Sequence, residues 1–276
     1  MFYPKLLLAG RPWIVRFAAQ LLNFNDTTMR NTIICTLLLL IFMAPAEAQV
    51  RFGVKAGLNL ATVSGTADFD DFFKDDYLGE SFKPTILPTF LIGAQVEFDF
   101  GTNIGIGTGL QISGKGFKMN ETILVDGERA TYDEKNNMVY LQIPVNFLYH
   151  NNGFFGAIGP YVGYGIGGRY DWEFDSDTDR ILDDGKIEYT NTIDVDDDIF
   201  SLVSKVRPFD FGAGIELGYE FTNLRLTAGF NMGISNVFPK DLVELADLEG
   251  NYDNFKISHR VFSIGAAWMF GERAAE

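Results

Sequence analysis

Residues 209–234 read FDFGAGIELGYEFTNLRLTAGFNMGI. Apolar side chains occupy every second position in 209–221 and again in 224–234, and glycine or polar residues occupy most positions between them. A period of two is typical of a β-strand whose two faces meet different environments. The short break at 222–223 predicts a tight turn between the two runs. The stretch therefore predicts a β-hairpin with one apolar face and one glycine-rich polar face.

Six further segments repeat this alternation. They cover residues 50–60, 90–100, 104–113, 139–149, 158–167 and 262–270. The connections between successive segments alternate between short turns and long loops, so one end of the sheet carries turns and the other carries loops. An even number of strands with this layout is typical of outer-membrane barrels. We therefore predict an all-β, eight-stranded antiparallel up-and-down transmembrane β-barrel, with both termini periplasmic and four long extracellular loops.

The same alternation would also fit a soluble, lipocalin-like barrel with its apolar face turned inward. Three features favour the membrane. The strands exceed the usual ~5–6 residues of soluble sheets and are long enough to cross a bilayer. Glycine weakens a water-facing strand, but it makes room for large side chains inside a narrow lumen. Aromatic residues near the strand ends fit the interfacial girdles of membrane barrels: Phe52, Phe98, Phe100, Tyr149, Phe221, Trp268 and Phe270.

The N-terminal residues predict targeting rather than fold. Residues 29–48 contain a basic start, an apolar core and a small-residue cleavage site ending at Ala48, which together predict a secretory signal peptide. Residues 1–28 precede a complete signal with its own methionine, and we expect them to be an upstream extension from a mis-called start. The remaining residues, 49–276, are predicted to form a single barrel domain.

Composition excludes several functional classes. The net charge of −15 repels phosphate backbones, so we expect no nucleic-acid partner. The single cysteine, Cys35, lies in the apolar core of the predicted signal, so the mature chain is expected to contain neither disulfides nor thiol chemistry. We also expect no cofactor.

Charged side chains on the polar face predict a network inside the barrel. The lumen set is Arg51, Lys55, Glu97, Asp99, Glu216, Glu220 and Arg225. Antiparallel register places Arg51 near Glu97 and Asp99, and it places Arg225 across a turn from Glu220. Charges in a constricted lumen need partners that offset their desolvation. Two interpretations remain open: mutual neutralisation that fills the barrel, and a role in ion conduction or gating.

The only two histidines are expected at opposite ends of the barrel, His150 at a periplasmic turn and His259 at the outer end of the eighth strand. This separation excludes a metal site that uses both, and we expect each to be a plain loop residue. An omptin-like or phospholipase-like hydrolase would need His259 beside a loop carboxylate or serine.

The third outer loop is strongly acidic. Its opening, Asp175-Ser176-Asp177-Thr178-Asp179, is similar to a calcium loop, but Arg180 stands where glycine is needed and Lys186 where the bidentate glutamate belongs. Two interpretations remain open here as well. The loop is either simply solvated, or its Asp175, Asp177 and Asp179 bind a divalent cation weakly and bridge to neighbouring lipopolysaccharide.

Four stretches resemble the Bacteroidetes outer-membrane β-barrel domain, a porin-like family that includes the PorT-type proteins. They are FGVKAGLN at 52–59, YLQIPV at 140–145, GPYVG at 159–163 and FDFGAGIE at 209–216. The resemblance implies an outer-membrane location and a barrel fold, and it does not imply one activity; some PorT-like relatives serve protein secretion. It also implies recognition by the barrel-assembly machinery through a final aromatic residue, here Phe270, which residues 271–276 follow.

These observations predict an integral protein of the bacterial outer membrane that is not an enzyme. We expect a structural or interaction role through the acidic extracellular loops, in secretion or surface assembly, because side chains fill an eight-stranded lumen. The alternative is a small-solute porin, and a remote alternative is a barrel hydrolase with a site in its loops. The expected partners are outer-membrane lipid, lipopolysaccharide, the barrel-assembly machinery and a protein bound by the loops.

Overall fold

The computed structural model describes seven parts of the chain. They are residues 49–66, 83–100, 103–125, 128–176, 180–192, 204–241 and 256–271. All belong to the compact unit Ala48–Glu276. The predicted upstream extension and signal peptide lie outside the described residues. None of the described helices combines the length and the apolar character needed to span a bilayer.

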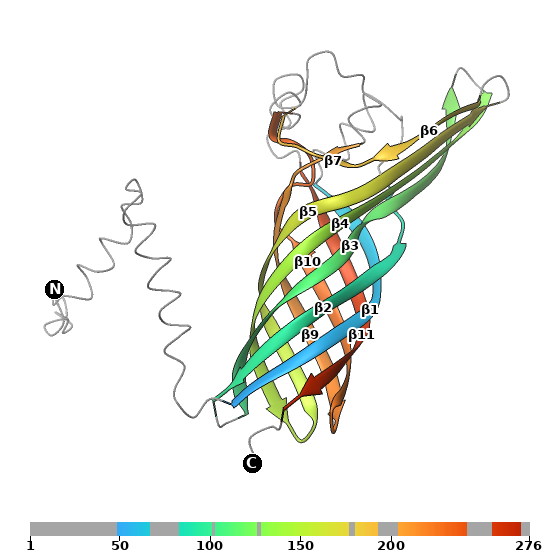
Figure 1. The fold of residues 1–276 in the computed structure, drawn as a ribbon. Helices are drawn as coiled ribbons and strands as arrows, with labels where there is room; N and C mark the ends of the chain where they lie inside the picture. Colours follow the sequence, from blue (N-terminus) through green and yellow to red (C-terminus); the bar gives the residue numbers. More distant parts are fainter. Residues whose placement is uncertain are drawn as a thin grey trace, which may run out of the picture. The chain divides into compact units, whose positions relative to one another are not determined.

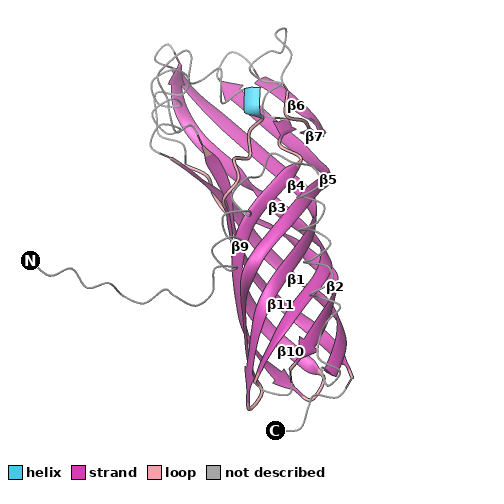
Figure 2. Cartoon of the chain, turned by 90° about the vertical axis from the view of Figure 1, so that its left-hand side faces the viewer, coloured by secondary structure: helices cyan, strands magenta, loops and turns pink. Residues whose placement is uncertain are grey.

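Within these residues, eight strands close into an antiparallel ring (Figure 1). They are β1 (Gln49–Gly65), β2 (Leu87–Asp99), β3 (Ile104–Val125), β4 (Glu128–Asn151), β5 (Phe154–Ser176), β9 (Phe209–Phe221), β10 (Leu224–Gly233) and β11 (Ile257–Phe270). Each strand pairs with its neighbour in this order, and β1 pairs with β11 to close the ring. The predicted eight-stranded up-and-down barrel is confirmed, and Figure 2 shows the common tilt of its strands from the side.

The outer surface of the ring is apolar. Side chains such as Phe52, Phe154 and Leu217 are 60%, 66% and 61% exposed, and they alternate with buried, mostly polar or small residues. Glycine on the inner face makes room for neighbours, since a Cβ on Gly214 would collide with the side chain of Asn231. A soluble barrel would hide its apolar face, so the burial pattern fits a barrel whose outside meets lipid.

Three short turns lie at one end of the ring, which we name the turn end; the opposite end is the loop end. The β4–β5 turn uses positive φ angles at Asn152 (47°) and Gly153 (83°), and Thr222 (55°) does the same in the β9–β10 turn. These angles match the tight turns that suit the twist of antiparallel hairpins. Strand β1 begins at the turn end and β11 finishes there (Figure 1).

Strands β3, β4 and β5 continue well past their predicted ends. Their added residues, together with β6 (Arg180–Lys186), form a sheet that we name the outer extension: 114–125, 128–138, 168–176 and β6. Figure 1 shows these strands running on past β1 and β2. The expectation of a long loop between the third and fourth strands was therefore wrong, because only residues 126–127 separate β3 from β4. Two short strands, β7 (Glu188–Tyr189) and β8 (Lys205–Val206), pair in parallel.

The physical reason for this difference is an inversion of polarity. The alternation continues into the outer extension, but its inward positions become apolar, as at Phe117 and Met119, and its outward positions become charged, as at Lys118 and Lys135. Outward residues that no longer meet lipid have no reason to be apolar. Outward apolar residues therefore end before the strands do.

Candidate functional site in the barrel lumen

Four charged side chains form a cluster near the turn end, which we name the inner network: Arg51, Glu97, Glu220 and Arg225. The register places Arg51 opposite Glu97 and Arg225 opposite Glu220. The two pairs also meet across the lumen. The Arg225 guanidinium donates to Glu97 Oε2 at 3.0 Å and to Glu220 Oε2 at 2.6 Å, and Arg51 pairs with Glu220. The lumen is therefore bridged by shared salt bridges.

Two further side chains pack against the inner network. The ring of Phe155 lies 3.9 Å from the guanidinium carbon of Arg225. His150 Nε2 lies 3.9 Å from carboxylate oxygens of both Glu97 and Asp99. The expectation that His150 is a plain loop residue was wrong, because its side chain is buried in the lumen. This position could have been predicted, because His150 and Gln142 are an even number of residues apart on the same strand and therefore lie on the same, inward face.

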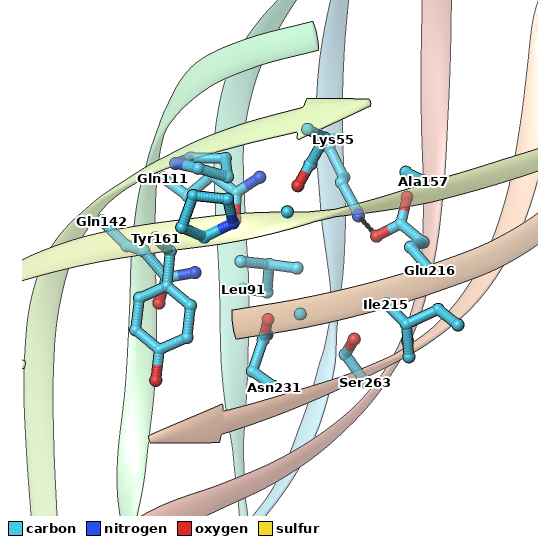
Figure 3. Close-up of a pocket in the computed structure, with 16 residues that line it drawn as sticks. Lys55, Leu91, Gln111, Gln142, Ala157, Tyr161, Ile215, Glu216, Asn231 and Ser263 are labelled. Carbon is cyan, nitrogen blue, oxygen red and sulfur yellow. Dashed lines mark hydrogen bonds and ion pairs between the residues drawn. The ribbon is translucent and has the colours of Figure 1, made fainter. Parts of the chain in front are cut away.

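Lys55 and Glu216 form a second ion pair further from the turn end, where Figure 3 shows them beside a small cavity. The cavity measures ≈ 40 Å³, which limits its contents to water-sized molecules. Much of its lining is polar, and it includes Gln111, Gln142, Asn146, Asn231 and Ser263. The Glu216 side chain keeps 20% exposure, so this pair is less desolvated than the inner network.

A third ion pair, Lys115 with Asp210, lies nearer the loop end, and we name it the outer pair. Lys115 Nζ is 2.6 Å from Asp210 Oδ2, and both side chains are buried. Tyr161 and Ser235 donate hydroxyl hydrogen bonds to the two carboxylate oxygens of Asp210, at 3.1 and 2.8 Å. Sequence reasoning missed this pair, because Lys115 lies beyond the predicted end of its strand and Asp210 was left without a partner.

His259 also lies inside the barrel, next to the outer pair. Its ring meets that of Tyr140 edge-on, with centroids 5.6 Å apart, and its side chain is only 1% exposed. The expectation of a plain loop residue was therefore wrong for His259 too. A hydrolase with its site in the loops would need this histidine at the surface.

Apolar side chains cross the lumen at the loop end, in a group that we name the outer cluster. Its buried members are Val63, Phe117, Met119, Met138, Tyr140, Ile187, Val206, Val237 and Ile257. The segment around β7 is tied to the barrel by Tyr189, whose hydroxyl donates to the backbone oxygen of Gly167 at 2.8 Å and accepts from the N–H of Val139 at 3.2 Å. A shared charge network thus bridges the lumen near the turn end, whereas at the loop end an apolar cluster lies beside a single ion pair.

Of the three candidate cation ligands, Asp175, Asp177 and Asp179, only Asp175 lies within the described residues. Asp175 lies at the outer end of β5, where the register places it opposite Arg180. Asp177 and Asp179 lie outside the described residues. In the parts of the chain that the structure describes, no group of three or more His, Cys, Asp or Glu side chains could hold a metal ion.

A closed antiparallel ring with an apolar outside and a filled interior defines a transmembrane β-barrel. The chain belongs to the outer membrane protein beta-barrel domain family, whose model matches residues 19–239. The protein is therefore located in the bacterial outer membrane.

Several solved structures are similar to this chain. The attachment invasion locus protein Ail of Yersinia pestis is 13% identical, with a TM-score of 0.36 over 80% of this chain and 99% of Ail. Neisserial surface protein A is 9% identical, with a TM-score of 0.33 over 79% and 97%. OprG from Pseudomonas aeruginosa is 12% identical, with a TM-score of 0.31 over 82% and 98%. A search of curated proteins finds no match. These likenesses are too distant to add to the family match.

Proposed function

We propose that this protein is a sealed outer-membrane barrel that acts by displaying its outer segments to a partner rather than by passing solutes. The observation that carries the proposal is the double closure of the lumen. The inner network bridges it near the turn end, and the outer cluster fills it at the loop end. Between them lies a cavity of only ≈ 40 Å³. Eight strands enclose an interior that side chains fill.

The outer extension supports the interaction role. Three strands of the barrel, β3, β4 and β5, reach past the ring, and β5 also pairs with β6, so a hydrogen-bonded sheet is available beyond the apolar belt. Loops and segments held by a rigid scaffold are common sites of binding. The resemblance of four strand segments to PorT-type proteins of Bacteroidetes supports a role in protein secretion or surface assembly. The proposal assigns no catalytic step, and the buried position of His259 is consistent with that.

A small-solute porin is the second candidate, and the polar lining of the central cavity favours it. Planar-bilayer recording of the purified full chain separates the two. A sealed barrel is expected to give no sustained, ion-selective current, in the wild type or in Arg180→Gln, a control whose side chain is exposed on the outer extension. Sustained current whose selectivity changes in Glu97→Ala would replace the sealed barrel with a porin.

The partner function needs a test in cells. A strain that lacks the gene is expected to lose secreted or surface-assembled proteins, while its permeability to small solutes stays unchanged. Complementation with the full chain should restore secretion. If the strain instead loses uptake of small solutes with its secreted proteins intact, the interaction role is wrong.

A further inference from the structure

The outward face of β4 changes character where the strand leaves the ring. Ile143 and Val145 are 43% and 51% exposed on the apolar outer surface, and Val139 continues that face. Asn137 and then Lys135 follow on the same face, because β4 pairs with β3 in unbroken register through this stretch. Lys135 lies roughly 13 Å further along the strand than Val139, at about 3.3 Å per residue. The first charge on this face thus stands just beyond the apolar belt.

Neighbouring strands place more cations at the same level. Lys118 of β3 is directly opposite Lys135, and Arg169 of β5 is directly opposite Lys186 of β6. Arg169 is also opposite Asn137, which is two residues from Lys135 on β4. We name these four side chains the basic row: Lys118, Lys135, Arg169 and Lys186. Like charges directly opposite each other destabilise a sheet unless an anion lies between them.

The carboxylates nearby neutralise only part of the basic row. Lys135 lies 3.7 Å from Asp171, and Arg169 lies 2.8 Å from Asp184. Both pairs are exposed to solvent, where such contacts contribute little. Among the described residues, no carboxylate lies within 4.0 Å of the ammonium group of Lys118 or Lys186. The row therefore keeps surplus positive charge in a chain whose net charge is −15.

The surplus is confined to one level of the outer extension. Further from the ring, the outward face carries three carboxylates, Asp133, Glu173 and Asp175, against two cations, Arg129 and Arg180, and Arg180 is paired with Glu173. A basic surface spread over the whole extension would suit a soluble anionic partner. A basic row limited to the edge of the apolar belt suits anions that lie at the membrane surface.

We propose that the basic row binds the phosphate groups of the glycolipid that forms the outer leaflet, lipopolysaccharide. The inference requires the loop end to face the cell exterior, as long loops of such barrels do. Lipid phosphates then lie at the level of the row, and lysine and arginine donate strong charge-assisted hydrogen bonds to phosphate oxygens. A bound phosphate would also separate the opposed pairs Lys118/Lys135 and Arg169/Lys186. The lipid would hold the outer extension at a fixed height above the membrane.

The test uses the purified full chain in nanodiscs of neutral phospholipid and measures binding of bisphosphorylated lipid A, dephosphorylated lipid A and inorganic phosphate. The wild type is expected to bind bisphosphorylated lipid A, with the other two binding much more weakly. Lys118→Gln and Lys186→Gln should each weaken binding about fivefold, and the double variant about 25-fold. Arg180→Gln, on the same face of β6 but in the acidic region, should bind as the wild type does.

Heat-modifiable migration on detergent gels shows whether each variant has folded. If the double variant does not fold, the two single variants carry the comparison. Unchanged affinity in folded Lys118→Gln and Lys186→Gln would overturn the proposal, and so would an equal loss in Arg180→Gln. Equal binding of dephosphorylated lipid A would show that acyl chains, not phosphates, are recognised. None of these outcomes depends on whether the lumen conducts.

Discussion

The two halves of the lumen hold buried charge in different ways. At the turn end, two arginines and two glutamates share hydrogen bonds across the barrel, and His150 and Asp99 lie close by. Toward the loop end, one lysine meets one aspartate beside an apolar cluster. A shared network keeps a partner for most of its charges after one is lost. A single pair does not, so the outer half should depend far more on each of its charged residues.

Asp210→Ala is expected to have the largest effect. It would leave the ammonium group of Lys115 fully buried without a counter-ion and remove the acceptor of Tyr161 and Ser235. Breaking a buried ion pair from one side costs about 3–5 kcal/mol. Guanidinium unfolding of the protein in lipid vesicles, followed by tryptophan fluorescence, measures this loss.

The matched variant removes both charges. Lys115→Met combined with Asp210→Leu leaves no unpaired ion, and replacing a buried ion pair by apolar side chains is often neutral or stabilising. The double variant should therefore recover most of the lost stability. If the double variant is as unstable as Asp210→Ala alone, the loss of stability comes from altered packing or from the loss of the carboxylate that accepts from Tyr161 and Ser235, and not from an unpaired Lys115.

Glu134 extends the comparison into the outer extension, beyond the apolar belt. Burial raises the pKa of Glu134 from 4.5 to about 7, and hydrogen bonds from Tyr132 and Asn136 offset only part of this rise. The folded state thus holds the proton more tightly than the unfolded state. The resulting stability is fully present below about pH 4.5 and is lost as the pH rises through about 7. The loss is on the order of 3 kcal/mol at most.

The difference in unfolding free energy between the wild type and Glu134→Gln isolates this group from the other carboxylates. As the pH rises from about 4.5 to about 7, the wild type should lose stability relative to Glu134→Gln, and above that range the difference should stay constant. A difference that does not change over this range would mean that Glu134 titrates normally, and that water reaches the inward face of the outer extension.

Arg225→Met tests the inner network and should cost less than Asp210→Ala. Arg51 would still neutralise Glu220, while Glu97 would lose the two hydrogen bonds that Arg225 donates and keep the one from Gln95. Hydrogen bonds to charged groups contribute about 1.5–3 kcal/mol each, but the guanidinium of Arg51 lies 3.9 Å from Glu97 and offsets part of the loss, so a net loss of about 2 kcal/mol is expected. The variant should remain non-conducting in planar bilayers, because the outer cluster still fills the lumen. A loss as large as that of Asp210→Ala would contradict the redundancy of the network.

Sequence alone could supply the local part of the inner network. Alternation assigns Arg51 and Arg225 to the lumen, and short turns fix which residues of adjacent strands lie opposite each other. The contact between Arg225 and Glu97 could not be predicted in this way, because β10 and β2 are not neighbours in the ring. It depends on the diameter at which the barrel closes, and that is a property of all eight strands together.

The outer half was missed for a different reason. Outward apolar residues mark the strands only as far as the apolar belt, and they end where the strands leave it. Phe117 and Met138 are apolar but point inward. The alternation therefore continues through them, but its apolar face is the inward one rather than the outward one. Testing each strand for period two regardless of which face is apolar would have found both the outer extension and the lumen position of Lys115.

Lys55→Met should have the smallest effect, because the pair of Lys55 and Glu216 combines features of both halves. It is a single pair, like the outer pair, but Glu216 is 20% exposed beside the cavity, so water can replace the lost cation. We expect a loss of about 1 kcal/mol in unfolding experiments. Lys55→Arg should retain nearly full stability if charge alone matters. A loss near that of Asp210→Ala would show that water in the cavity does not hydrate Glu216. The different sensitivity of the two halves to the loss of one charge would then come from the shared network of the turn end alone, and not from access of water.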